Sequence, residues 1–231
     1  MNSQKQGRIG MAAAALVWGL FSLQTANSAV IATDLSTTVM VPGISQFSTD
    51  GAEMAGMSVT VNFDGGSETV QWAATGPMSG AAAGSGWSIS AAGDTFTANA
   101  WAADFGDLQV TSFVLDGSTG LTLFDRPFDP FPGTPDSAAG LDFVSTLLGD
   151  ADVLATYSSV VGIGATPPVT DLFQVLTVSF SDVENGTVSG LFNFTQDTDS
   201  DIRIQIPEPA MLPLFGLGLA GVAIIARKRA A

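Results

Sequence analysis

Residues 58–66 read Ser-Val-Thr-Val-Asn-Phe-Asp-Gly-Gly, with apolar and polar side chains in strict alternation before the turn residues. Successive side chains of a strand point to opposite faces, so this pattern is typical of a strand with one buried face. The Asp and the two Gly residues supply the turn that ends it. Residues 69–73, around Trp72, are therefore expected to return as its antiparallel partner.

Similar short runs recur along the chain and are separated by turn residues. The further strands that we expect cover residues 95–100, 109–115, 121–124, 153–158, 173–180, 187–194 and 202–206. Many short strands with few helix formers favour an all-β body, built as an antiparallel β-sandwich or jelly roll. The Ala-rich residues 138–148 are expected to hold a short helix. The Pro-rich residues 126–135 predict a surface loop that covers a sheet edge or, alternatively, contacts a sugar.

Charge is distributed unevenly along the 231 residues. All 22 acidic residues lie between Asp34 and Glu208, where only Arg126 and Arg203 are basic, so this segment has a formal net charge of −20. Such an anionic surface repels phosphate, which argues against nucleic acid as a partner, and it attracts divalent cations, cationic polymers or basic proteins. The alternative is that the acids simply keep an exported protein soluble.

Cysteine and histidine are both absent from the sequence. Their absence removes thiolate chemistry, disulfides, the commonest general base and the usual zinc ligands. Any catalysis would depend on carboxylates, hydroxyl groups or Tyr157. We therefore expect a protein that is not an enzyme and needs no cofactor. The alternative is a secreted carboxylate-dependent glycoside hydrolase, because a pair of carboxylates is sufficient for that reaction.

Asp197, Asp199 and Asp201 alternate with Thr and Ser and form the best candidate for a metal site. Alternate carboxylates in a turn can converge on Ca²⁺, which takes about six to eight oxygen ligands. The run is not an EF-hand, because Ile202 stands where that loop requires Gly. A weak Ca²⁺ site and a merely solvated acidic loop both fit the pattern.

The first 29 residues have the order of a secretory signal peptide. Lys5 and Arg8 precede an apolar stretch at residues 11–23, and small residues follow at 26–29. The apolar stretch is short for a membrane span, so we expect cleavage after it in preference to a retained anchor. The body of the protein is then residues 30–206.

Residues 210–226 carry no charge, and Arg227, Lys228 and Arg229 follow at once. A helix of this length measures about 25 Å, the short end of what crosses a bilayer. The positive-inside rule would keep the basic residues in the cytoplasm. We therefore expect one C-terminal transmembrane helix, with the body on the periplasmic side of the inner membrane.

Pro207-Glu208-Pro209 stands just ahead of this span, and its two prolines favour an extended, accessible segment. The order of this motif, an apolar Gly-rich helix and a basic end resembles a PEP-CTERM protein-sorting domain, here residues 207–231. The resemblance implies recognition of Pro207, Glu208 and Pro209 by an exosortase, a membrane-embedded transpeptidase-like enzyme of Gram-negative bacteria. Processing near the motif would release the body from its helix.

The same resemblance implies a role outside the cell. Proteins of this kind usually belong to systems that make exopolysaccharide for biofilm or floc. We therefore expect a non-enzymatic protein of the cell surface or extracellular matrix that associates with exopolysaccharide. The hydrolase alternative would act on that same matrix polysaccharide.

Overall fold

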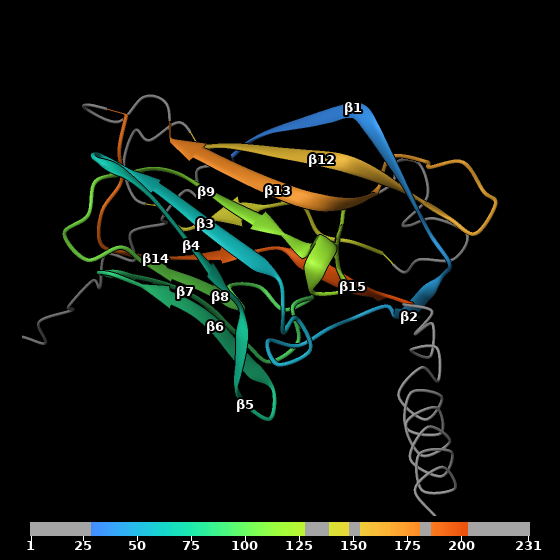
Figure 1. Cartoon of the computed structure of the whole chain (residues 1–231), viewed down its shortest axis with the longest axis horizontal. Helices are drawn as coiled ribbons and strands as arrows, with labels where there is room; N and C mark the ends of the chain where they lie inside the picture. The colour runs from blue at the N-terminus through green and yellow to red at the C-terminus, as the bar shows by residue number, and fades with distance from the viewer. Residues whose placement is uncertain (1–28, 128–138, 148–152, 181–185, 203–231) are drawn as a thin grey trace, which may run out of the picture.

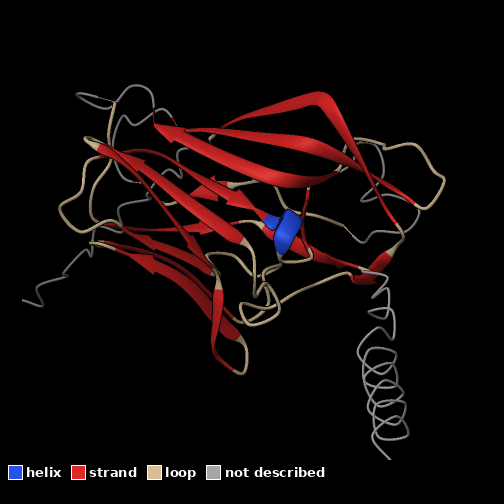
Figure 2. Ribbon diagram, viewed as in Figure 1, coloured by secondary structure: helices blue, strands red, loops and turns tan. Residues whose placement is uncertain are grey.

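The computed structural model describes residues 29–127, 139–147, 153–180 and 186–202. Within these ranges the chain forms strands and a single short 3₁₀ turn, η1 (Gly117–Thr119), as Figure 2 shows. None of the helices in these ranges has the length and apolar character that crossing a membrane requires. The expected signal peptide, apart from Ala29, and the expected sorting domain at 207–231 lie outside the described residues.

The strands form two sheets that pack as layers, seen one above the other in Figure 1. The larger sheet has the order β2–β15–β10–β13–β9–β3–β4. Outside this order, β12 also pairs with β13, and β1 pairs with β12. Its strands are β1 (Val30–Val41), β2 (Ile44–Gln46), β3 (Ser58–Phe63), β4 (Gly66–Gln71), β9 (Val110–Asp116), β10 (Thr122–Asp125), β12 (Val153–Ile163), β13 (Leu172–Phe180) and β15 (Asp197–Asp201).

The smaller sheet has the order β11–β14–β8–β7–β6–β5. Its strands are β5 (Ala73–Gly76), β6 (Ser79–Gly84), β7 (Trp87–Ala92), β8 (Trp101–Asp104), β11 (Val144–Ser145) and β14 (Leu191–Thr195). Pairing in both sheets is antiparallel except between β1 and β12, which run parallel. The predicted fold class, an all-β and sandwich-like body with antiparallel sheets, is confirmed.

The core lies between the two layers and is rich in aromatic side chains. Phe194 of the smaller sheet stacks on Trp101 at a centroid distance of 5.3 Å and lies 5.8 Å from Phe113 of the larger sheet. All three side chains are fully buried. Aromatic side chains bury the largest apolar areas, so this cluster is a main source of the hydrophobic stabilisation that joins the layers.

Several expected strands are confirmed, above all β3 with its Asp64-Gly65 turn, and β9, β10 and β13. The strand expected at 95–100 is wrong, because Asp94 starts a turn there. Its carboxylate accepts the N–H of Phe96, and its carbonyl accepts the N–H of Thr97, in place of ladder partners. The helix expected at 138–148 is also wrong over residues 139–147, which contain no helix and supply the short strand β11.

Candidate metal centre

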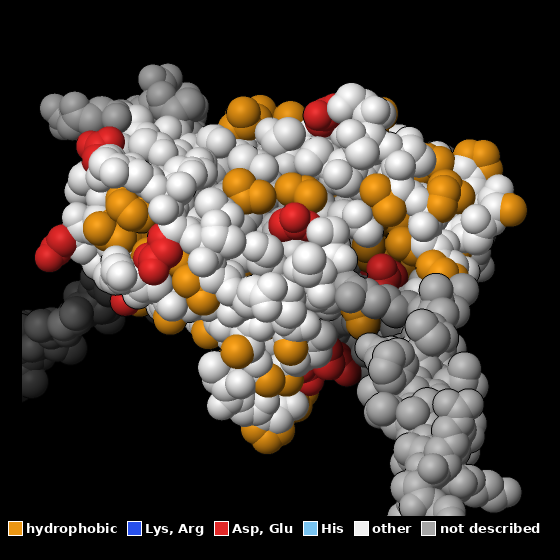
Figure 3. Space-filling view, viewed as in Figure 1, with side chains coloured by type: hydrophobic (Ala, Val, Ile, Leu, Met, Phe, Trp, Pro, Cys, Tyr) orange, Lys and Arg blue, Asp and Glu red, His pale blue; other side chains and the backbone are white. Residues whose placement is uncertain are grey.

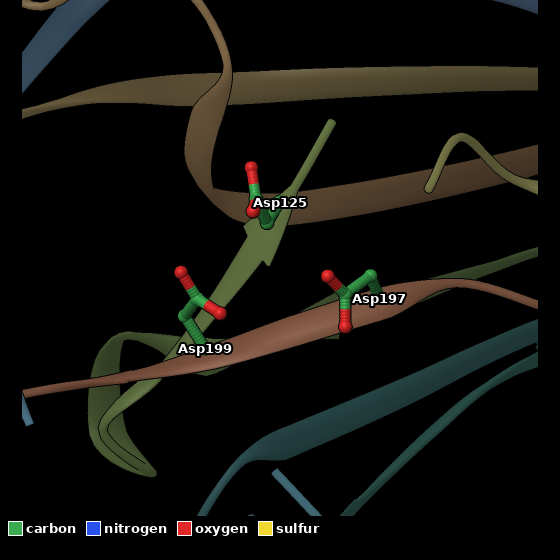
Figure 4. Close-up of side chains that lie close together, drawn as sticks. All are labelled: Asp125, Asp197 and Asp199. Carbon is green, nitrogen blue, oxygen red and sulfur yellow. The ribbon is translucent and has the colours of Figure 1, made fainter. Parts of the chain in front are cut away.

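The end of the larger sheet brings three carboxylates together. β15 pairs with β10 so that Asp125 lies opposite Asp197, and Leu123 lies opposite Asp199. Side chains alternate along a strand, and paired residues share a face, so Asp125, Asp197 and Asp199 lie on the same face of the sheet. One carboxylate oxygen from each residue lies within 4.8 Å of the other two. Figure 4 shows the three side chains on these two neighbouring strands.

All three aspartates are 0% exposed. Oδ1 of Asp197 accepts a long hydrogen bond of 3.4 Å from Thr95 Oγ1, and its Oδ2 is buried with no hydrogen-bond partner in the described part of the chain. Burial disfavours the charged form and raises the pKa of Asp197 to about 7, and the charge of Asp94 adds to this rise. The hydrogen bonds from Thr198 and Thr95 act in the opposite direction.

An apolar cluster adjoins the three carboxylates on their own face of the sheet. Leu123, which shares this face with Asp125 and is paired with Asp199, packs with Val41 and Leu172 in this second, smaller cluster. Apolar neighbours exclude water and lower the local dielectric constant, which strengthens every interaction between charges there.

The opposite face of β15 is fastened by threonines. The hydroxyl of Thr198 lies 2.5 Å from that of Thr49 and donates to that of Thr95 over 3.0 Å, and all three residues are buried. The Thr49 carbonyl also accepts the N–H of Thr95 at 2.9 Å. These contacts hold β15 against two loop segments, the one around Thr49 before β5 and the one around Thr95 after β7. The strand that carries Asp197 and Asp199 is therefore held in place on this face by hydrogen bonds.

Gln196, which directly precedes β15, connects this region to the core. Its carbonyl accepts the indole N–H of Trp101 at 2.8 Å, and its side-chain oxygen accepts the hydroxyl of Tyr157. Burial raises the pKa of Tyr157 well above its usual range, so its phenol stays neutral. The guanidinium of Arg126 lies 4.9 Å from the ring centroid of Tyr157 and pairs with Asp142 at 2.5 Å. Tyr157 is therefore a buried structural residue.

The structure departs from the sequence-based site in two respects. The turn expected for Asp197, Asp199 and Asp201 is wrong, because these residues form strand β15. Asp201, at the end of that strand and opposite Ile44, is outside the group of three, and Asp125 takes its place. Asp125 was missed because it becomes a neighbour only through the register of β10 with β15. Its position at the end of the expected strand 121–124 was the one available signal.

A surface hollow of about 270 Å³ is lined by Phe47, Ser48, Asp94, Phe96 and Ala139. Phe47 and Phe96 are 47% and 44% exposed. Ser48 Oγ donates to Asp94 Oδ1 at 2.6 Å. The hollow thus combines exposed aromatic surface with a hydroxyl and a carboxylate.

Comparison with protein families finds a match at the C-terminal end of the chain. The sequence model described as the PEP-CTERM protein-sorting motif matches residues 205–229. The chain therefore carries a PEP-CTERM protein-sorting motif. The protein is thus exported, sorted by an exosortase through this motif, and located at the cell surface or outside the cell. Compared with curated proteins and with solved structures, it has no significant match.

Proposed function

We propose that this PEP-CTERM protein is a non-enzymatic component of the extracellular matrix that associates with exopolysaccharide. The observation that carries the proposal is the sorting motif at residues 205–229, which directs the β-sandwich body out of the cell. In the proposed route the signal peptide at residues 1–29 is removed, and residues 210–226 hold the protein transiently in the inner membrane. The exosortase then acts near Pro207-Glu208-Pro209.

The surface charge narrows the class of polymer. On the face seen in Figure 3, acidic side chains are scattered and no basic side chain is visible among the described residues. Such a surface repels an acidic polysaccharide over about a Debye length, so a neutral or amine-bearing polymer is the better partner.

Two features of the body support a binding role over a hydrolytic one. The three clustered carboxylates are 0% exposed, whereas a glycosidase places its carboxylates on either side of a bond in an accessible cleft. Tyr157, the other candidate catalytic group from the sequence, is buried in the core.

The hollow between Phe47 and Phe96 is the proposed contact for the polymer. An aromatic ring offers an apolar face on which a sugar ring can stack, while a polar group beside it fixes orientation. Here Ser48 and Asp94 supply that polar group.

A co-sedimentation assay on purified matrix polysaccharide tests the proposal. We expect the protein to sediment with the polymer without changing the polymer's length. The double variant Phe47→Ala/Phe96→Ala should bind at least tenfold more weakly, whereas Met78→Ala, which removes a comparably exposed side chain elsewhere, should bind as the wild type does.

Other outcomes of this assay point elsewhere. Shortening of the polymer that a single Asp or Glu substitution abolishes would establish the hydrolase alternative. An absence of co-sedimentation would contradict the matrix role, and equal binding by the double variant would place the contact on another face.

A further inference from the structure

We propose that one end of the sandwich, formed by Pro42, Gly43, residues 164–170 and Ile202, lies on the lipid surface of the inner membrane before processing. We call this part of the body the uncharged end. The inference rests on the membrane step of the proposed function, in which residues 210–226 hold the chain in the bilayer. It adds which end of the body faces the lipid and which side chains enter the interface.

Three segments that are distant in sequence meet at the uncharged end. The N–H of Gly164, in the β12–β13 loop, donates to the Val41 carbonyl at 2.8 Å. The N–H of Ile202 donates to the Gly43 carbonyl at 2.9 Å. A Cβ added at Gly43 would lie 3.0 Å from Cδ1 of Ile202, so this side chain covers the turn between β1 and β2. Figure 1 shows the β12–β13 loop, β2 and the end of β15 at the same end of the sandwich.

The uncharged end exposes apolar side chains. Ile202 and Phe47 are 42% and 47% exposed, and Met40 is 49% exposed. A Cβ at Gly162 would lie 2.7 Å from Sδ of Met40 and 2.8 Å from the Thr166 carbonyl oxygen, so Met40 borders the loop. A surface hollow of about 260 Å³ is lined by Pro42, Gly43, Ile44, Phe47 and Ile163. Figure 3 shows apolar side chains gathered at this end, and such a patch is typical of a surface that contacts a protein or a membrane.

Charged residues are missing from the two long segments that build this end. Residues 35–49 and 154–170 contain no Asp, Glu, Lys or Arg, although the chain has 22 acidic residues. Of the acids that follow these segments or precede Ile202, Asp171 is fully buried and Asp201 is half-buried. A charged group must lose hydration to enter the membrane interface. The uncharged end can therefore approach lipid at a lower cost than the acidic remainder of the surface.

The short tether selects lipid as the occupant of this surface. Residues 203–209 separate Ile202 from the uncharged stretch at 210–226. Even a fully extended chain of this length reaches only about 25–29 Å. Until the exosortase acts, the end that carries Ile202 therefore stays close to the bilayer, and the tether makes even a weak contact effective by raising its local concentration. A second copy of the chain has no such tether, and two bodies of the same negative charge repel each other.

A fluorescent label on the full-length protein tests the docking. The chain has no cysteine, so the variant Thr166→Cys carries a single label in the exposed β12–β13 loop. Ser85→Cys, at an exposed position in the turn between β6 and β7, is the matched control. The protein is placed in phosphatidylcholine nanodiscs that contain lipid with a spin-labelled headgroup as quencher. We expect the label at position 166 to be quenched at least threefold more strongly than the label at position 85.

A substitution at the chain exit tests which side chain enters the interface. Ile202→Gln should at least halve the excess quenching at position 166, because a polar amide replaces an exposed apolar side chain. Met78→Gln makes the same kind of change at a side chain that is 54% exposed elsewhere, and it should leave the quenching unchanged. Phe47 is kept in both variants, because it also lines the hollow proposed to bind polysaccharide.

The results that would overturn the proposal can be told apart. Protein that does not incorporate into the nanodiscs would refute the membrane step and the docking with it. Protein that incorporates but shows equal quenching at both labels would refute the docking alone, as would equal effects of the two Gln variants. Shielding of position 166 that requires two chains in one disc would assign the uncharged end to contact with a second copy.

Discussion

At the residue scale, Gln196 and Asp197 show two outcomes for neighbouring buried polar groups. Gln196 is surrounded by partners, since it accepts from Trp101 and Tyr157 and its amide donates to the Leu141 carbonyl at 3.3 Å. Asp197 has weaker partners: its Oδ1 accepts a long hydrogen bond from Thr95 Oγ1, and its Oδ2 has no hydrogen-bond partner in the described residues. The first group stabilises the fold, whereas the raised pKa of the second makes stability depend on pH.

Substitution of Asp197 by Asn should flatten the pH dependence of stability in EDTA. Burial raises the pKa of Asp197 from 3.8 to about 7, so between these values the folded state holds a proton that the unfolded state has released. The contribution of Asp197 to stability is therefore greatest below about pH 4 and falls as the pH rises to about 7, by an amount on the order of a few kcal/mol. Urea unfolding at pH 5 and pH 8 measures the difference.

Asp107→Asn is the matched control, because Asp107 is exposed. It should keep the wild-type difference between the two pH values. If Asp197→Asn also kept that difference, a carboxyl other than Asp197 would have to carry the titration.

At the scale of single elements, β6 owes its conformation to its neighbours. Its sequence, Ser-Gly-Ala-Ala-Ala-Gly, has little intrinsic preference for a strand. The strand passes directly over the turn at Gly51, where the indole of Trp72 donates to the Gly51 carbonyl at 2.7 Å. A Cβ at Gly80 would collide with both that carbonyl and the indole nitrogen.

Gly80→Ala should therefore destabilise the protein by about 1–3 kcal/mol, since the neighbouring atoms belong to backbone and to a buried ring that cannot move aside. Ala83→Ser, at an exposed position of the same strand, should change the free energy of unfolding by less than about 0.5 kcal/mol. Chemical denaturation of both variants measures these values. Equal stabilities would show that β6 does not pack closely on the turn.

The same contrast explains which elements could be predicted from the sequence. β3, β9 and β13 combine alternating or continuous apolar residues with turn residues at their ends, so local pattern and fold agree. β6 and β15 carry Gly, Ala, Asp, Thr and Ser, and they become strands only through pairing with partners. Asp125 could not be predicted as a member of the candidate site for the same reason. It lies beside Asp197 only through the register of β10 with β15, and neither segment's sequence alone determines that register.

At the scale of the whole molecule, aromatic contacts join the two sheets. Phe194 of β14 lies 5.8 Å from Phe113 of β9 and 5.2 Å from Phe143. The ring of Phe105, the residue directly after β8 of the smaller sheet, also lies 6.1 Å from that of Phe113. The sandwich is stabilised without disulfides, since the chain has no cysteine, so its stability depends on this packing.

Phe194→Ala should cost about 3–5 kcal/mol, the usual range for a large cavity in a core that cannot collapse around it. Leu191→Ala on the same strand is the control, because Leu191 is 69% exposed and should change stability by less than about 0.5 kcal/mol. Thermal unfolding of the two variants tests the prediction. A small effect of Phe194→Ala would mean that the layers are joined mainly elsewhere.

The charge pattern and the sorting motif agree on where the folded body works. Twenty-two acidic residues lie in the segment ahead of residues 210–226, and the motif at 205–229 directs export and exosortase sorting. The intact mass of the protein recovered from the cell surface tests this account most directly. We expect a mass that lacks the residues beyond Pro207-Glu208-Pro209, and retention of that tail when the three are replaced by Ala. A surface protein that still ends at Ala231, or full-length protein found in the cytosol, would contradict it.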